Sequence, residues 1–273
     1  MAKSDRFGAS SYIAPLSARE RELLAGWERA RQTRLTRKAL VEKWGTSVAS
    51  DITKKLVRKG VIKRISRGVY WVVPMRAQAR PTAISAPVAL AAMLADEPYY
   101  LGGLWAFSYH RLTQQLYTSK LDAFVTRRRR PRQLAHATVG FHVVPKDSIS
   151  AGAELHRIEG TGVWVGSAER TVLDALDYPD AIGGLRAALG LVKPALERVD
   201  STKLIRMAAA HSRASTCQRL GVLLERVTTK KTRPSLAPLR RRVQETRSVL
   251  SMLSDAPRRG HLNPVWRVVE NDR

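Results

Sequence analysis

The strongest constraint on the fold is an ordered pattern in residues 17–73, where three stretches of helical periodicity precede two β-prone runs. The first stretch opens with a capping box, because Ser17 and Glu20 can each satisfy an unpaired amide of a starting helix. Apolar residues then recur at helical spacing. This pattern predicts a first helix that ends at about Arg31.

A second helix is predicted to begin after Thr36, a residue type that is favoured at the N-cap. Its buried face is expected to consist of Leu40, Val41 and Trp44. Gly45 then ends the helix and supplies a tight turn.

A third helix is predicted over Ser47–Lys59, with Thr46 or Ser47 as its N-cap. Gly60 comes directly after this helix, at the position where a glycine with left-handed backbone conformation commonly ends a helix. Apolar residues recur every four positions along the helix, which predicts a core stripe of Val48, Ile52 and Leu56.

Two β-prone runs, 61–65 and 69–73, follow the third helix. Ser66, Arg67 and Gly68 lie between them and form a turn of hairpin length. Three helices, a glycine turn between the second and third, and then a basic-tipped hairpin follow the order of a winged helix-turn-helix.

We expect this winged helix-turn-helix domain over residues 1–76, with its core at about 17–74. Pro74 and Pro81 bracket a predicted linker. A second domain is then expected over 77–273, because 273 residues exceed what one small domain needs.

The charge of the chain is strongly positive and unevenly distributed. There are 48 Lys and Arg against 23 Asp and Glu, a formal net charge of +25. Residues 1–76 hold 18 basic and 6 acidic residues, a net charge of +12, whereas residues 151–225 hold 9 of each. An excess of this size indicates a polyanionic partner, with nucleic acid as the first candidate and an anionic membrane surface as the second.

Other sequence features favour the nucleic acid. No stretch approaches the ~20 apolar residues of a membrane span, and the first 16 residues lack the apolar run of a signal peptide. Cys217 is the only cysteine, which excludes an internal disulfide and a cysteine-based zinc site. We therefore expect a cytoplasmic, non-enzymatic protein with no metal and no cofactor.

The helix-turn-helix interpretation assigns contacts with double-stranded DNA to the third helix. In this motif the second of the paired helices enters the major groove, and its N-terminal residues meet base edges. The predicted base-edge residues are Thr46, Ser47, Ser50 and Lys54, and the predicted phosphate contacts are Lys55 and Arg58.

Two further sets of residues are expected at the DNA backbone. Amides and cations at the start of the second helix suit a phosphate, and a basic hairpin tip suits the backbone or the minor groove. These sets are Thr36, Arg37 and Lys38, and Lys63, Arg64 and Arg67. The alternative for each residue is a solvated basic surface.

The rest of the chain predicts a mixed α/β domain with a helical C-terminal block, so the whole chain is of the α+β class. Helices are predicted at 85–94 and 104–112, with an extended segment at 99–103 between them. Further strands are predicted at 121–126, 137–144, 154–158 and 162–165, further helices at 168–176, within 182–226 and at 236–253, and an extended tail at 263–270.

Two arginine clusters in this second domain suggest contact with nucleic acid. Adjacent guanidinium groups repel one another unless a polyanion is near, so the clusters would extend the DNA contact or meet RNA. A solvated surface is the alternative for both. The clusters are Arg127, Arg128, Arg129 and Arg130, and Arg240, Arg241 and Arg242.

Three other patterns are better explained as structural. Glu169, Arg170 and Asp174 resemble a catalytic set, but a helix dipole and an i,i+4 ion pair account for them. The glycines of 160–166 enter a predicted strand rather than leave one, which excludes a dinucleotide loop. The six histidines show no spacing typical of metal ligands.

Several segments together resemble the AbiEi-type antitoxins of type IV toxin–antitoxin systems. The likeness extends over most of the chain from about residue 17. The segments that carry it are Leu56–Tyr70, Gly103–Thr113, Ser167–Leu176 with Gly183 and Gly184, Arg219–Arg226 and Leu262–Trp266.

The resemblance implies an N-terminal winged helix that represses its own operon, bound to inverted repeats. It also implies a C-terminal antitoxin domain that counteracts a nucleotidyltransferase-like toxin, directly or indirectly. The alternatives are a stand-alone winged-helix transcription factor whose C-terminal domain senses a ligand or partner, and a nucleic-acid enzyme. The enzyme hypothesis needs acidic residues clustered around a metal, and the sequence offers no such set.

Overall fold

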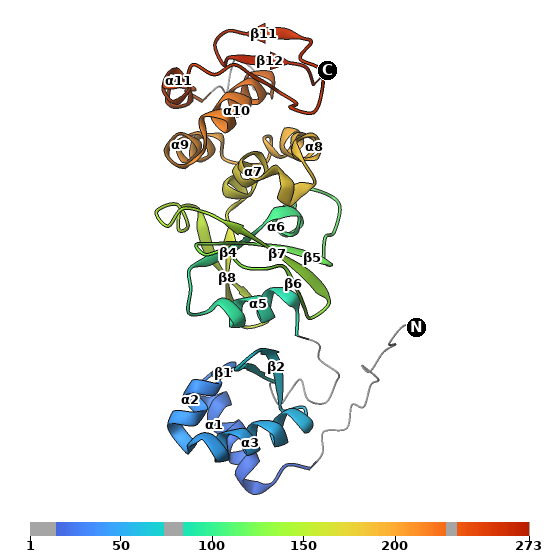
Figure 1. Ribbon diagram of the computed structural model, residues 1–273, viewed down its shortest axis with the longest axis vertical. Helices are drawn as coiled ribbons and strands as arrows, with labels where there is room; N and C mark the ends of the chain where they lie inside the picture. Colours follow the sequence, from blue (N-terminus) through green and yellow to red (C-terminus); the bar gives the residue numbers. More distant parts are fainter. Residues whose placement is uncertain (1–14, 74–83, 228–233, 273) are drawn as a thin grey trace, which may run out of the picture. The chain divides into compact units, whose positions relative to one another are not determined.

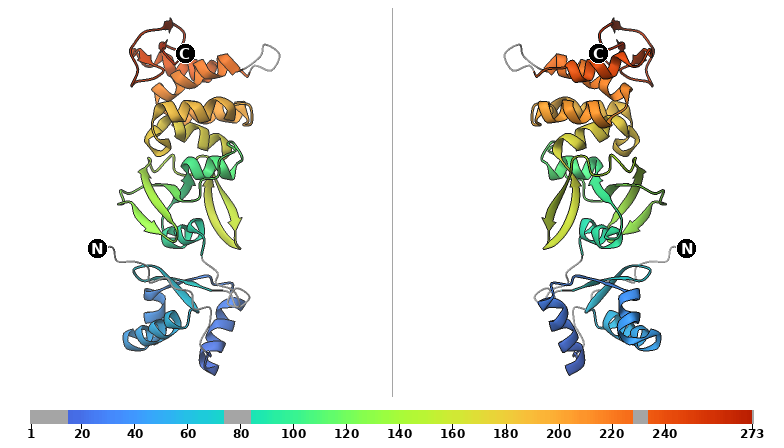
Figure 2. Two further views of the ribbon diagram at one scale, coloured as in Figure 1. Left: turned by 90° about the vertical axis from the view of Figure 1, so that its right-hand side faces the viewer. Right: turned by 90° about the vertical axis from the view of Figure 1, so that its left-hand side faces the viewer.

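The computed structural model describes residues 15–73, 84–227 and 234–272 (Figure 1, Figure 2). The chain is of mixed α+β architecture with a helical C-terminal block. It divides into two compact units, the first formed by 1–95 with the short segments 134–136 and 158–161, and the second by the remainder. The predicted boundary at 76/77 lies outside the described residues.

The first unit opens with α1 (Ala18–Arg29) and the predicted capping box is confirmed. The amide of Glu20 donates to Ser17 Oγ at 3.3 Å, and the amide of Ser17 donates to Glu20 Oε2 at 2.8 Å. The next helix, α2 (Arg37–Trp44), has the predicted cap as well, because the Ala39 amide donates to Thr36 Oγ1 at 3.2 Å.

The third helix, α3 (Thr46–Arg58), departs from the sequence prediction in two ways. Its N-cap is Gly45, at φ +76°, and neither Thr46 nor Ser47 caps it with a side chain. The predicted core stripe is confirmed at Leu56, and Ile52 packs against the core, but it was wrong at Val48, which is 43% exposed while Ala49 is buried. A seven-residue step spans two helical turns, so Ala49 and Leu56 share the core face.

The two strands that follow α3 are β2 (Ile62–Ser66) and β3 (Val69–Val72), and they pair antiparallel as predicted. Sequence analysis missed β1 (Arg34–Thr36), which pairs antiparallel with the other edge of β3. Three residues are too few to show a strand periodicity. Their pairing makes the hairpin part of a three-stranded sheet of order β1-β3-β2.

A six-stranded sheet of order β6-β7-β5-β4-β9-β8 follows in the chain (Figure 1). Strand β4 pairs antiparallel with β5 and parallel with β9, and β5 pairs parallel with β7. The predicted strands all form, and β6 is an additional short one. The elements from residue 86 to 166 are α5 (Ala86–Leu94), β4 (Tyr99–Gly102), α6 (Gly103–Tyr109), β5 (Lys120–Val125), β6 (Arg132–Leu134), β7 (Ala137–Val143), β8 (Ala153–Ile158) and β9 (Thr161–Gly166).

The C-terminal block is mainly helical and ends in a three-stranded sheet of order β10-β12-β11. The helix predicted over 236–253 stops at Gln244, because the next residues turn and enter a strand instead. The elements are α7 (Ala168–Asp177), the 3-10 helix η1 (Pro179–Ile182), α8 (Leu185–Ala195), α9 (Ser201–His211), α10 (Ala214–Val227), α11 (Ala237–Gln244), β10 (Leu250–Ser251), β11 (His261–Asn263) and β12 (Val268–Glu270). Among the described residues, no helix combines the length and apolar character that crossing a membrane requires.

Trp266 anchors the C-terminal strands to α10. Its indole ring is fully buried in the core of the helical block. The ring lies against the backbone at Gly221, where a Cβ atom would approach Trp266 Cε3 to 2.2 Å. Only glycine leaves room for this contact.

We expect Gly221→Ala to lower the free energy of unfolding by about 1–3 kcal/mol, because the new methyl group overpacks the core. Gly190→Ala is the matched control. A Cβ atom at Gly190 in α8 would meet no neighbouring atom within 4 Å, so alanine there should be neutral or raise stability by up to ~1 kcal/mol. Urea denaturation measures both, and equal effects of the two substitutions would contradict the packing argument.

The carboxylate of Asp272 ties the end of the chain to α8 and α10. Arg226 donates to both of its oxygens, at 2.7 and 3.0 Å, and Lys193 Nζ donates at 3.0 Å. Burial alone would raise the pKa of Asp272, but these hydrogen bonds outweigh burial and hold the pKa at about 2.

A carboxyl group with a lowered pKa in the folded state stabilises the protein above its unfolded pKa, and this stability is lost as the pH falls through the folded value. We expect Asp272→Asn to lower the free energy of unfolding by about 1–2 kcal/mol at pH 7, after allowance for solvent screening. The difference from wild type should shrink between pH 4 and pH 2. A difference that stays constant over this range in urea titrations would show that charge is not its cause.

Candidate nucleic-acid interface

A groove of about 670 Å³ lies between α3, the start of α2 and the β2–β3 hairpin. The helix α3 contributes positions from two successive turns, and the hairpin contributes the opposite wall. The residues that line the groove are Arg37, Ala49, Ser50, Thr53, Lys54, Arg64, Arg67, Gly68 and Tyr70.

The lining of this groove holds four cationic side chains and no carboxylate. Arg37, Lys54, Arg64 and Arg67 are all exposed. Gathering like charges around a concave surface raises the local potential and destabilises the unliganded state. The groove is therefore suited to an anion that extends across both of its walls.

The hairpin wall is positioned by a backbone hydrogen bond to α2. The Arg37 amide donates to the Gly68 carbonyl at 2.7 Å. Gly68 adopts φ +77°, in the left-handed region that favours glycine. A bulge between Arg64 and Ser66 shifts the register of the hairpin, and bulges increase local twist.

On the helix wall, side chains form a short chain of hydrogen bonds. Arg37 Nη2 donates to Ser50 Oγ at 3.4 Å, and Ser50 Oγ donates to the Thr46 carbonyl at 2.8 Å. These contacts orient Arg37 across the groove toward α3.

The predicted role of the α2 amides in phosphate binding needs correction. The Arg37 amide is taken by the Gly68 carbonyl, and the Ala39 amide by Thr36 Oγ1. Thr36 is half-buried and acts as a cap. The side-chain charges remain exposed at Arg37 and at Lys38, whose Nζ lies 4.0 Å from Glu42.

Several predicted contact residues do not line the groove. Thr46, Ser47 and Arg58 are exposed at the two ends of α3, and Lys63 is half-buried on β2. Lys55 lines a different hollow, which also contains Glu20 and Asp51.

Four residues that line the groove were not predicted as contact residues, and two of them, Thr53 and Tyr70, have polar side chains; the other two are Ala49 and Gly68. Thr53 follows Ala49 by one helical turn, on a face of α3 that was not predicted to be part of the site. Tyr70 was interpreted only as a β-prone residue of the hairpin. The sequence feature that could have indicated Tyr70 as a groove residue is its position two residues after the glycine of the hairpin turn.

The two arginine clusters are partly engaged within the chain. Arg129 pairs with Glu97 at 2.6 Å, and Arg127, Arg128 and Arg130 beside it are exposed after β5. On α11, Arg240 contacts Glu225 at 3.4 Å and lies over Trp266 at 5.7 Å from the ring centre.

Arg242 pairs with Glu245, while Arg241 is exposed. Each cluster thus offers some exposed cations and uses others in structure. A third basic run, Lys230, Lys231 and Arg233, lies outside the described residues.

The predicted ion pair of α7 is confirmed, with Arg170 Nε donating to Asp174 Oδ1 at 2.8 Å. Both side chains are buried. Burial raises the pKa of Asp174 to about 6, although Arg170 opposes the shift. Glu169 accepts from Ser167 and pairs with Lys203 at 2.9 Å, in agreement with a structural role.

Two histidines have acidic neighbours that sequence spacing did not reveal. His142 Nε2 lies 2.8 Å from Oδ1 of the buried Asp122, across the paired strands β5 and β7. His156 Nε2 lies 3.6 Å from Glu154. Gly160 lies in the turn before β9, and Gly162 and Gly166 lie within the strand, so these glycines enter a strand as predicted.

No family model and no curated protein matches the sequence. Among solved structures, the chain is similar to the crystal structure of the RV2827C protein from Mycobacterium tuberculosis, with a TM-score of 0.61 and 14% sequence identity. The match covers 94% of this chain and 92% of that chain. A likeness at this level of identity shows a shared fold alone.

Proposed function

We propose that the first unit is a winged helix-turn-helix that binds duplex DNA in a sequence-specific manner. The observation that carries the proposal is the groove between α3 and the hairpin, with four exposed cations and no carboxylate in its lining. Helices α2 and α3, joined at Gly45, serve as the helix-turn-helix, and the β2–β3 hairpin serves as the wing.

The geometry of the groove supports a division of roles among its residues. Ser50 and Lys54 lie on the groove face of α3 and are the residues best placed for base edges. Arg64 and Arg67 on the hairpin bind the phosphate backbone. Arg37 binds a phosphate from the start of α2 through its side chain.

Duplex DNA is a better partner for this groove than duplex RNA. The major groove of B-form DNA admits an α-helix, whereas the major groove of A-form RNA is too deep and narrow for side chains to read. A helix with a small residue such as Ser50 beside Lys54 on its groove face suits the wider DNA groove.

The resemblance to AbiEi-type antitoxins extends the proposal to autoregulation and toxin counteraction. The protein would repress its own operon, and its second unit would counteract a nucleotidyltransferase-like toxin. Support for this part comes from the sequence motifs. Two of these motifs make contacts within the second unit, since Arg219 donates to the Met252 and Ser251 carbonyls and Asn263 accepts from the Trp266 amide.

A stand-alone transcription factor with a ligand-sensing second unit is the other candidate. It is favoured by a cavity of about 600 Å³ in that unit, between the sheet and the helical block. DNA binding by the first unit is common to both candidates.

DNA binding is tested by fluorescence anisotropy with duplex from upstream of the gene and a scrambled duplex. We expect the native duplex to bind at least ~10³-fold more tightly. Lys54→Ala should weaken binding about tenfold and reduce discrimination. Arg67→Ala should weaken both duplexes alike and reduce the salt slope by about 1.

Arg29→Ala is the matched control, because Arg29 is exposed at the end of α1 and does not line the groove. It removes the same charge, so an equal loss of affinity in this variant would mean that net charge alone drives binding. Equal affinity for the native and scrambled duplexes would refute sequence specificity.

Toxin counteraction is tested by co-expression with the nucleotidyltransferase-like toxin that the family resemblance predicts beside this gene. We expect the full chain with Lys54→Ala and Arg67→Ala to restore growth as well as wild type does, because the groove belongs to the first unit. Expression from an independent promoter removes the effect of autoregulation. Loss of growth rescue by soluble variant protein would assign counteraction to the DNA-binding groove instead.

A further inference from the structure

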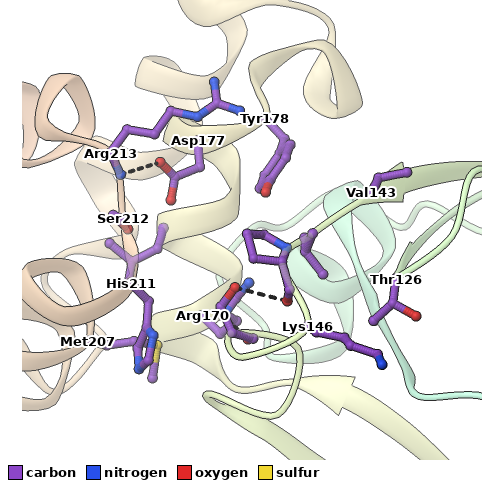
Figure 3. A pocket seen from close by; sticks show the side chains of 14 residues that line it. Thr126, Val143, Lys146, Arg170, Asp177, Tyr178, Met207, His211, Ser212 and Arg213 are labelled. Carbon is purple, nitrogen blue, oxygen red and sulfur yellow. Dashed lines mark hydrogen bonds between the residues drawn. The ribbon is translucent and has the colours of Figure 1, made fainter.

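The cavity of the second unit is built from several elements that are distant in sequence (Figure 3). One wall is formed by Thr126 after β5 and by the end of β7 with the loop that follows it. The other is formed by α7, the end of α9 and the residues before α10. Its volume of about 600 Å³ is in the range of small-molecule sites.

The rim of the cavity carries two cations that lie outside any ion pair of the described residues, and the Asp177 carboxylate belongs to the same lining. Lys146 and Arg213 are both exposed, and neither forms an ion pair within the described part of the chain. Figure 3 shows them on opposite sides of the opening. His211 lines the same cavity from α9. An anionic group is favoured in such a place.

A flat stacking surface lies on the side of Arg213. Its guanidinium lies over the Tyr178 ring, 5.3 Å from the ring centre. The Tyr178 and Phe124 rings make an edge-type contact, with 5.4 Å between ring centres, and this contact fixes the position of the Tyr178 ring. Guanidinium and phenol planes of this kind are typical partners of unstacked nucleobases.

Asp177 provides a hydrogen-bond acceptor beside this surface. Its Oδ1 accepts from the Arg213 amide at 3.2 Å (Figure 3). The same oxygen accepts from Thr216 Oγ1 at 2.7 Å. Its second oxygen takes no hydrogen bond from any residue that the structure describes. A carboxylate oxygen of this kind is suited to a hydroxyl group, as on ribose.

The lining of the cavity also includes a fixed guanidinium group and several apolar side chains. Arg170 is locked there, since it donates to Asp174 and to the Ser148 and Ala151 carbonyls at 2.8 to 3.0 Å. The apolar side chains that complete the lining are Val143, Val144, Pro145, Leu173 and Met207.

We propose that this cavity binds a nucleotide, with the base on Tyr178 and Arg213, a ribose hydroxyl on Asp177 and the phosphate toward Lys146. The inference stands apart from DNA binding by the first unit. The same base, ribose and phosphate occur in a free nucleotide and at an exposed end of single-stranded RNA.

Calorimetric titration of the full-length protein tests the site with AMP, GMP, CMP and UMP. Inorganic phosphate, unphosphorylated adenosine and a short single-stranded RNA form separate arms. We expect at least one nucleotide or the RNA to bind, and Arg213→Ala and Lys146→Ala to weaken that binding about tenfold or more. Arg206→Ala should leave it unchanged, because Arg206 is exposed on α9 and does not line the cavity.

Each arm decides one part of the proposal. Binding of the mononucleotides identifies a free ligand, and binding of the RNA alone identifies an RNA end. Inorganic phosphate binding as tightly as AMP would overturn the nucleotide assignment, since the base and ribose would then contribute nothing. No binding in any arm, or equal losses in the Arg206 and Arg213 variants, would overturn the site itself.

Discussion

The buried guanidinium of Arg170 is the contact on which the second unit most depends. It joins α7 to the loop at 148–151 through two carbonyls and lies over the Tyr100 ring of β4 at 4.9 Å. Burial alone would lower its pKa, but the charge of Asp174 outweighs burial and raises it, so the ion pair keeps the arginine charged. Removing one partner of such a pair leaves a buried charge uncompensated, which is strongly destabilising. Arg170 thus links α7 of the helical block both to the 148–151 loop and to the sheet.

The two units use positive charge in different ways. In the groove of the first unit, four cations face solvent together without a carboxylate. In the second unit, arginines such as Arg226 and Arg219 donate to carboxylates and carbonyls, whereas others such as Arg213 stay exposed. The net charge of a sequence segment therefore indicates a binding site for a polyanion only if the fold leaves the cations of that segment unpaired.

Most elements could be predicted from the sequence, because caps and periodicity are local. Thr36 and Ser17 indicate where their helices begin, and the turn at Gly68 indicates the hairpin. The features that were not predicted depend on tertiary packing. The short strand β1 exists only because β3 lies beside it, and the core phase of α3 is chosen by the rest of the core, which buries Ala49 rather than Val48. The residues that line the cavity of the second unit are spread along the sequence between Thr126 and Arg213, so no local sequence pattern could reveal it.

The pairing of β1 with β3 has a consequence for how the first unit meets a ligand. A hairpin attached at its base alone would sample many orientations and would lose that freedom on binding. Here the hairpin is one edge of a sheet, and its turn is bound to the first residue of α2. The relative placement of Arg37, Arg64 and Arg67 is then settled during folding. A preorganised surface of this kind gives up little conformational entropy when it associates, so more of its contact energy remains as affinity.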